Sequence, residues 1–185
     1  MKFARAFAPA TVANVCCGFD ILGFAIADHG DEVEVRFSDT PGIRMIEITG
    51  DNGKLPMEAN KNTCSVAVQS YLGALGKDVN IDIILNKNLP LGSGMGSSAA
   101  SAAAALVAIN TLMGEPMTRK DLVPHAMEAE RIACGTGHAD NVAPSILGGF
   151  VLIRDYHPLD LLKVSFPKEL CCVLVHPHLE VKTED

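Results

Sequence analysis

A glycine-rich segment with two adjacent serines is the part of the sequence best suited to bind phosphate. It runs Pro90-Leu-Gly-Ser-Gly-Met-Gly-Ser-Ser-Ala-Ala-Ser101 and leads into an alanine-rich stretch. Glycines let a backbone adopt positive φ and approach a ligand closely, and alanine is the best helix former. The free N–H groups at the start of such a helix bind anions. The segment therefore predicts a triphosphate site, with a ligand-free glycine turn as the alternative.

Two common nucleotide motifs differ from this segment in their spacing. A Walker A loop requires a lysine just before its Ser or Thr, and Gly96 stands at that place. The dinucleotide fingerprint is Gly-x-Gly-x-x-Gly, whereas the pattern here is Gly-x-Gly-x-Gly. The segment is therefore of neither kind.

Composition and charge exclude several classes of function. The chain has 185 residues, with 15 Lys and Arg against 22 Asp and Glu, for a net charge of −7. Nucleic-acid binding needs a basic surface, and a membrane helix needs about 18 consecutive apolar residues. The sequence favours neither nucleic acid nor a membrane as a partner.

The six cysteines lack zinc-site spacing, and without a secretory signal we expect reduced thiols in a cytoplasmic protein.

The hydrophobic patterns predict strands and helices that do not alternate strictly. A weak capping box, Thr118-x-x-Asp121, opens one of the helices. This mixture favours an α+β fold over a doubly wound parallel sheet. The predicted strands are 3–8, 24–28, 32–37, 43–49, 79–85, 149–155 and 170–176, and the predicted helices are 62–75, 97–113 and 118–134.

Three segments together resemble the GHMP kinases. Pro90-x-x-x-Gly94-x-Gly96-Ser-Ser98-Ala99 resembles the phosphate loop of that superfamily. The opening Pro9-Ala-Thr-Val-Ala-Asn-Val-Cys-Cys-Gly-Phe-Asp-Ile-Leu-Gly23 resembles its first motif in the homoserine kinase form. Gly137-His-Ala-Asp-Asn-Val-Ala-Pro144 is similar to a third segment of the same form.

The resemblance implies a fold and a domain organisation. Residues 1–160 would form the GHMP kinase N-terminal ATP-binding domain, which is related to the second domain of ribosomal protein S5. Residues 161–185 would begin the C-terminal domain, which in the family carries another glycine-rich motif and a substrate-binding arginine. We therefore expect a truncated chain with the C-terminal domain largely missing.

The resemblance also implies a reaction. Family members transfer phosphate from Mg-ATP to the side-chain hydroxyl of L-homoserine, giving O-phospho-L-homoserine for threonine biosynthesis. The partners would be this small molecule and, with the oligomeric state open, a second copy in a homodimer. Two alternatives remain: a non-catalytic nucleotide-binding module on the same fold, and a GHMP kinase for another small alcohol. RNA binding is disfavoured by the acidic charge.

The resemblance assigns nucleotide and metal roles to particular residues. Ser98 and Glu130 would hold Mg²⁺, which prefers hard oxygen ligands. A helix cap is the alternative role for Ser98, a solvated surface charge for Glu130, and a loop lysine in water for Lys87. The expected nucleotide contacts are Asn62, Lys87, Pro90, Leu91, Gly92, Ser93, Gly94, Met95, Gly96, Ser97, Ser98, Ala99 and Ala100.

The same resemblance assigns the residues that would bind the phosphate acceptor, L-homoserine. Asn14, Asp20, His138 and Asn141 would bind the amino acid, with a carboxylate facing its ammonium group. Phosphoryl transfer depends mainly on positioning and charge neutralisation. We therefore expect Asn141 to position the hydroxyl and Asp140 to support it, rather than Asp140 to act as an obligatory base.

Overall fold

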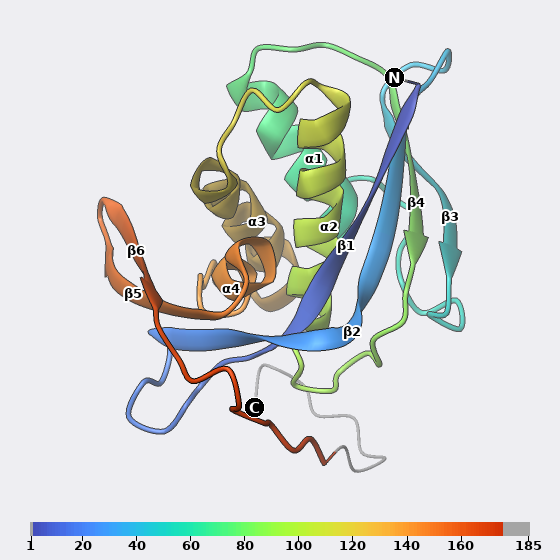
Figure 1. Cartoon of the computed structure of the whole chain (residues 1–185). Helices are drawn as coiled ribbons and strands as arrows, with labels where there is room; N and C mark the ends of the chain where they lie inside the picture. The colour runs from blue at the N-terminus through green and yellow to red at the C-terminus, as the bar shows by residue number, and fades with distance from the viewer. Residues whose placement is uncertain (1, 176–185) are drawn as a thin grey trace.

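A computed structural model describes residues 2–175, apart from the side chain of Cys134. In it, four helices cover one face of a strongly curved sheet (Figure 1). The helices are α1 (Thr63–Ala74), α2 (Ser97–Leu112), α3 (Arg119–Cys134) and α4 (Val142–Leu147). The strands are β1 (Phe3–Val12), β2 (Leu22–Phe37), β3 (Ile43–Thr49), β4 (Ile81–Asn86), β5 (Phe150–Tyr156) and β6 (Leu159–Val164).

The long strand β2 connects the two halves of the sheet. The strand order is β3-β4-β2-β5-β6, with β1 also paired to β2. Residues 32–37 of β2 pair with β4, whereas residues 22–24 pair with β5. Among the strand pairs within residues 2–175, only β3 and β4 are parallel. The sequence predicted two strands here, 24–28 and 32–37, but the chain passes through Asp28 at φ 62° and continues as one strand.

Helix α2 lies at the centre of the helical layer, and its alanines allow that position. It packs against β1 and β2 on one side and against α1, α3 and α4 on the others. Twelve of its sixteen residues are buried, and a helix that is apolar all round is a buried one. Small side chains let five elements approach the same helix, so the alanine run serves packing as well as helix formation.

The predicted α+β class is confirmed, but α4 and β6 were not predicted, and one strand predicted near the C-terminal end is absent from the described residues. The capping box at Thr118 and Asp121 is present at the start of α3. The predicted strand 170–176 is wrong over residues 170–175, which have no regular structure, while residue 176 lies outside the described part. Residues 170–175 find no partner strand there, whereas β6 pairs with β5. The predicted domain boundary at residue 160 falls inside β6, and the division stays a prediction.

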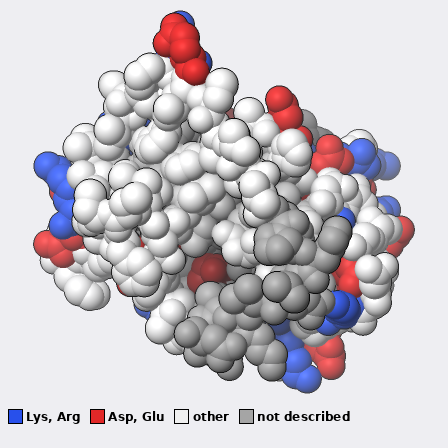
Figure 2. Space-filling model, turned by 90° about the horizontal axis from the view of Figure 1, so that it is seen from below, with Lys and Arg blue, Asp and Glu red and all other residues white. Residues whose placement is uncertain are grey.

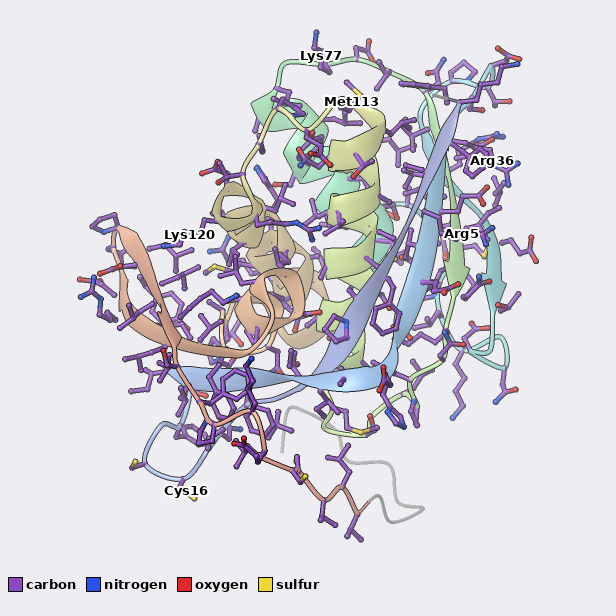
Figure 3. The ribbon with its side chains drawn as sticks, viewed as in Figure 1. Arg5, Cys16, Arg36, Lys77, Met113 and Lys120 are labelled. Carbon is purple, nitrogen blue, oxygen red and sulfur yellow. The ribbon has the colours of Figure 1, made fainter. Side chains whose placement is uncertain are left out.

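The surface shows where charge gathers. Seen from the lower end of Figure 1, charged side chains lie mainly around the rim, and the centre of that face is largely uncharged (Figure 2). On the sheet face opposite the helices, Arg5 and Arg36 point outward (Figure 3), and both pair with Glu34. Within the described residues, no helix has the length and apolar character needed to cross a bilayer.

Candidate functional site

The glycine loop connects β4 to α2 and contains three glycines at positive φ. Gly92, Gly94 and Gly96 have φ values of 64°, 71° and 60°, a region that favours glycine. Gly96 is the N-cap of α2, and no side chain in the described part of the chain caps the helix by a hydrogen bond. The alternative role of Ser98 as the cap is therefore wrong. The first-turn N–H groups, at the positive end of the helix dipole, face the loop.

Thr11 holds this loop against the segment that contains Asn141. Thr11 is fully buried; its N–H donates to the Met95 carbonyl oxygen over 3.1 Å, and its hydroxyl donates to Asn141 Oδ1 over 2.7 Å. A Cβ atom at Gly96 would lie only 2.0 Å from Thr11 Oγ1. Thr11 had no predicted role, because the predicted first strand ends at residue 8 whereas β1 continues to Val12.

A cavity of about 450 Å³ lies along the loop and brings together residues from distant parts of the chain. Of the predicted nucleotide residues, Pro90, Met95, Ala99 and Ala100 do not line it, and Met95 packs with Ala100 in a small apolar cluster instead. The predicted residues that do line it are Asn14, Asn62, Lys87, Leu91, Gly92, Ser93, Gly94, Gly96, Ser97, Ser98, Glu130 and Asn141.

Two buried serine hydroxyl groups at this cavity make no hydrogen bond to the described residues. The Oγ atoms of Ser93 and Ser97 are inaccessible to solvent and have no hydrogen-bond partner among the described residues. Buried polar groups are normally hydrogen-bonded, so this pair fits a ligand rich in acceptor oxygens. Ser98 and Glu130 line the same cavity. Glu130 is only 9% exposed, so a solvated surface charge is the wrong description of it, and its donor set with Ser98 suits Mg²⁺.

Asn62 and Lys87 are both engaged by the protein itself. Asn62 caps α1: its Oδ1 accepts from the N–H of Cys64 over 3.0 Å, and its Nδ2 donates to the Pro56 carbonyl oxygen over 2.9 Å. The Lys87 side chain is 1% exposed and pairs with Asp31. A loop lysine in water is therefore wrong for Lys87, and its contact with a nucleotide stays a prediction.

Beside the cavity, three of the residues predicted to face the phosphate acceptor lie close together. One polar atom each from Asp20, His138 and Asp140 lies within 4.8 Å of the others, and His138 Nδ1 is 3.7 Å from Asp20 Oδ1. Burial raises the pKa of Asp140, and the nearby His138 opposes that rise. The N–H of Asn141 donates to Asp140 Oδ1 over 3.0 Å, so Asn141 joins this cluster to the cavity.

Tyr156 and Gly23 hold together the two segments that form the cluster, and neither residue had a predicted role. The hydroxyl of Tyr156 donates to the carbonyl oxygen of Asp20 and accepts from the N–H of Ala139, each over 3.3 Å. A Cβ atom at Gly23 would lie 1.8 Å from the carbonyl oxygen of Asp140. Asp20 itself has φ 60°, a strained value that requires support from its surroundings. Gly23 is the last residue of the first motif, whereas Tyr156 belongs to none of the three motifs.

Comparisons with known proteins identify a family and several relatives that this chain is similar to. The family model for the GHMP kinases N terminal domain matches residues 62–149. Homoserine kinase from Chloroherpeton thalassium is 54% identical over 99% of this chain, and one from Xanthomonas campestris is 41% identical over 99%. The chain spans 60% and 56% of their respective lengths.

Solved structures show the same fold. The crystal structure of homoserine kinase from Cytophaga hutchinsonii aligns with a TM-score of 0.91 and 53% identity, covering 99% of this chain and 58% of that one. Mevalonate kinase from Methanococcus jannaschii aligns over 89% of this chain and 56% of that one, with a TM-score of 0.67 at 15% identity. The second likeness concerns the fold alone.

Proposed function

We propose that this chain, whose residues 62–149 match the N-terminal domain of the GHMP kinases, binds Mg-ATP and belongs to an enzyme that phosphorylates L-homoserine. The product would be O-phospho-L-homoserine, an intermediate of threonine biosynthesis. Five of the cysteines are free thiols, in keeping with our proposal of a cytoplasmic location. A non-catalytic nucleotide-binding module and a kinase for another small alcohol are the alternatives.

One observation carries the proposal: Asn141 belongs to both halves of the site. It lines the cavity along the glycine loop, and its backbone N–H is bonded to Asp140 in the carboxylate and imidazole cluster. A phosphate donor in the cavity and an amino alcohol at the cluster would therefore meet at this residue. Holding two reactants in such a geometry is a large part of catalysis.

On the nucleotide side, the loop and the first turn of α2 supply donors for phosphate oxygens. The buried hydroxyls of Ser93 and Ser97 would donate to these oxygens together with the backbone N–H groups. Ser98 and Glu130 would hold Mg²⁺, whose charge neutralises the phosphate oxygens when it is bound.

On the acceptor side, each group has a distinct task. Asp20 would pair with the ammonium group of the amino acid, while His138 faces its polar end. The Oδ1 atom of Asn141 already accepts from Thr11, so its amide nitrogen is the group left to donate to the substrate hydroxyl. Asp140, whose pKa is raised by burial, supports Asn141 through the backbone N–H.

The test measures binding and turnover separately. Calorimetry of this chain with Mg-ATP should show one site. ADP release should then depend on L-homoserine, with L-threonine and mevalonate as comparison substrates, in this chain and in the whole gene product where that is longer. Release with mevalonate instead would favour another kinase of the superfamily. Binding without release by either form would favour the non-catalytic module.

A further inference from the structure

We infer that the buried ion pair of Lys87 and Asp31 positions the glycine loop by holding both of its ends. Lys87 would then act through the protein rather than by touching phosphate. This inference deepens the proposed nucleotide site and rests on it for its functional consequence. Its structural part concerns the loop alone and can be tested without any ligand.

The strand register brings the two charges together inside the protein. Glu32 of β2 lies opposite Asn86 of β4, so the next pair in this antiparallel register is Asp31 and Lys87. Their side chains are 0% and 1% exposed, and Lys87 Nζ lies 2.5 Å from Asp31 Oδ2. A buried charge left alone is costly, so each of these residues needs the other.

The carboxylate of Asp31 holds the beginning of the loop. Its Oδ1 atom accepts the backbone N–H of Asn88 over 2.9 Å and that of Leu89 over 3.0 Å. Because these are the two residues that follow Lys87, the direction in which the chain leaves β4 is set by Asp31.

The ammonium group of Lys87 holds the end of the loop. It donates to the carbonyl oxygen of Ser97, the first residue of α2, over 2.6 Å, and to Ser101 Oγ over 2.9 Å. The Ser101 hydroxyl in turn donates to Asp31 Oδ2 over 2.7 Å. Both ends of the loop, residues 88–89 and residues 97–101, are therefore tied to one ion pair.

This arrangement uses the full donor capacity of Lys87. An ammonium group has three N–H donors, and Asp31, Ser97 and Ser101 provide three acceptors. A direct contact with phosphate would require one of these bonds to break. The loop between the tied ends contains three glycines at positive φ, which have little conformational preference of their own, so external anchors are needed to fix its shape.

Two variants separate positioning from direct contact. Lys87→Met removes the ammonium group, and Asp31→Asn removes the negative charge while keeping an oxygen for the loop N–H groups. If Lys87 positions the loop, both variants loosen it. If Lys87 instead binds phosphate, Asp31→Asn frees it to do so more strongly. Lys61→Met is the matched control, because Lys61 lines the same cavity but its side chain is 62% exposed.

The first measurement is amide hydrogen exchange of the ligand-free chain. We expect Lys87→Met and Asp31→Asn to raise exchange in residues 88–98 about tenfold or more, with α3 unchanged and with no effect of Lys61→Met. An equal rise in α3 would indicate general destabilisation and overturn the inference, as would an unchanged loop. Should the charge variants fail to fold, Ser101→Ala removes one bridge and predicts a smaller rise confined to the same residues.

The second measurement is the affinity for Mg-ATP by calorimetry. Both charge variants should weaken binding by a similar factor of about ten, which corresponds to about 1.4 kcal/mol. Loss of affinity in Lys87→Met with an unchanged loop, or tighter binding in Asp31→Asn, would identify Lys87 as a phosphate ligand and overturn the inference. Failure of the unaltered chain to bind Mg-ATP would refute the proposed function and leave the exchange result standing.

Discussion

Replacing Gly96 by alanine places a methyl group where the side chain of Thr11 already lies. The new Cβ atom would be 2.0 Å from Thr11 Oγ1 and 2.9 Å from Asn141 Oδ1. Thr11 is fully buried and cannot turn away into solvent. We therefore expect Gly96→Ala to break the hydrogen bond between Thr11 and Asn141 and to push the loop away from β1.

The free energy of unfolding should fall for two reasons. Alanine in the left-handed region costs about 1–2 kcal/mol, and loss of the hydrogen bond adds about 0.5–1.5 kcal/mol. Gly94→Ala is the matched control, because Gly94 has φ 71° but nothing within 4 Å of its Cβ position. Gly94→Ala should lose only the free energy that alanine costs in the left-handed region, about 1–2 kcal/mol.

Urea unfolding of the two variants and of Thr11→Ala supplies the comparison. The double variant Gly96→Ala with Thr11→Ala should be more stable than the sum of the single changes predicts, because the smaller side chain makes room for the methyl group. Equal stability of Gly96→Ala and Gly94→Ala, or strictly additive effects in the double variant, would refute the close packing of the loop on Thr11.

Three further variants probe the site and the fold. Ser97→Ala should leave stability unchanged or slightly higher, because its buried hydroxyl has no partner, yet weaken Mg-ATP binding about tenfold, measured by calorimetry. Asp140→Asn should raise the thermal midpoint at pH 7, because burial raises the pKa of Asp140 and its charged form opposes folding. This gain in stability should vanish at acid pH, where the unaltered carboxylate takes up a proton. The same variant should show reduced ADP release. Burial lowers the pKa of His125, so the unfolded chain binds its proton first and stability should fall as the pH drops below about 6.5; His125→Gln should flatten that slope in unfolding curves recorded between pH 7 and 5.

Local patterns predicted the helices better than the strands. Three helices begin and end within a residue or so of their predicted limits, because caps such as Asn62 and Thr118 are encoded next to the helix itself. The extent of β2 depends on partners more than a hundred residues away in β5. The stretch 170–175 has an apolar composition suited to a strand, but a strand also requires a neighbour, which no local pattern reveals.

The site was predictable to the extent that its chemistry is local. The glycines and serines of the loop form a recognisable pattern within twelve residues. The role of Lys87, in contrast, depends on Asp31, which lies in β2. A signal was present: Asp31 shares the inward face of β2 with Val33 and Val35. Lys87 likewise follows Ile83 and Leu85 on the inward face of β4. Two opposite charges at inward positions of adjacent strands predict a buried pair.

The hydrogen bond between Thr11 and Asn141 joins residues 130 positions apart. Together with the ion pair of Asp31 and Lys87, it means that the glycine loop takes its shape from segments spread over most of the described chain. Contacts of such long sequence separation slow folding, because their loop-closure entropy is lost before they contribute stability. During synthesis, the loop would leave the ribosome well before Asn141 does. We expect nucleotide binding to become possible only after α4 has been made, so that nascent chains ending near residue 120 would fail to bind Mg-ATP even though every glycine and serine of the loop is already in place.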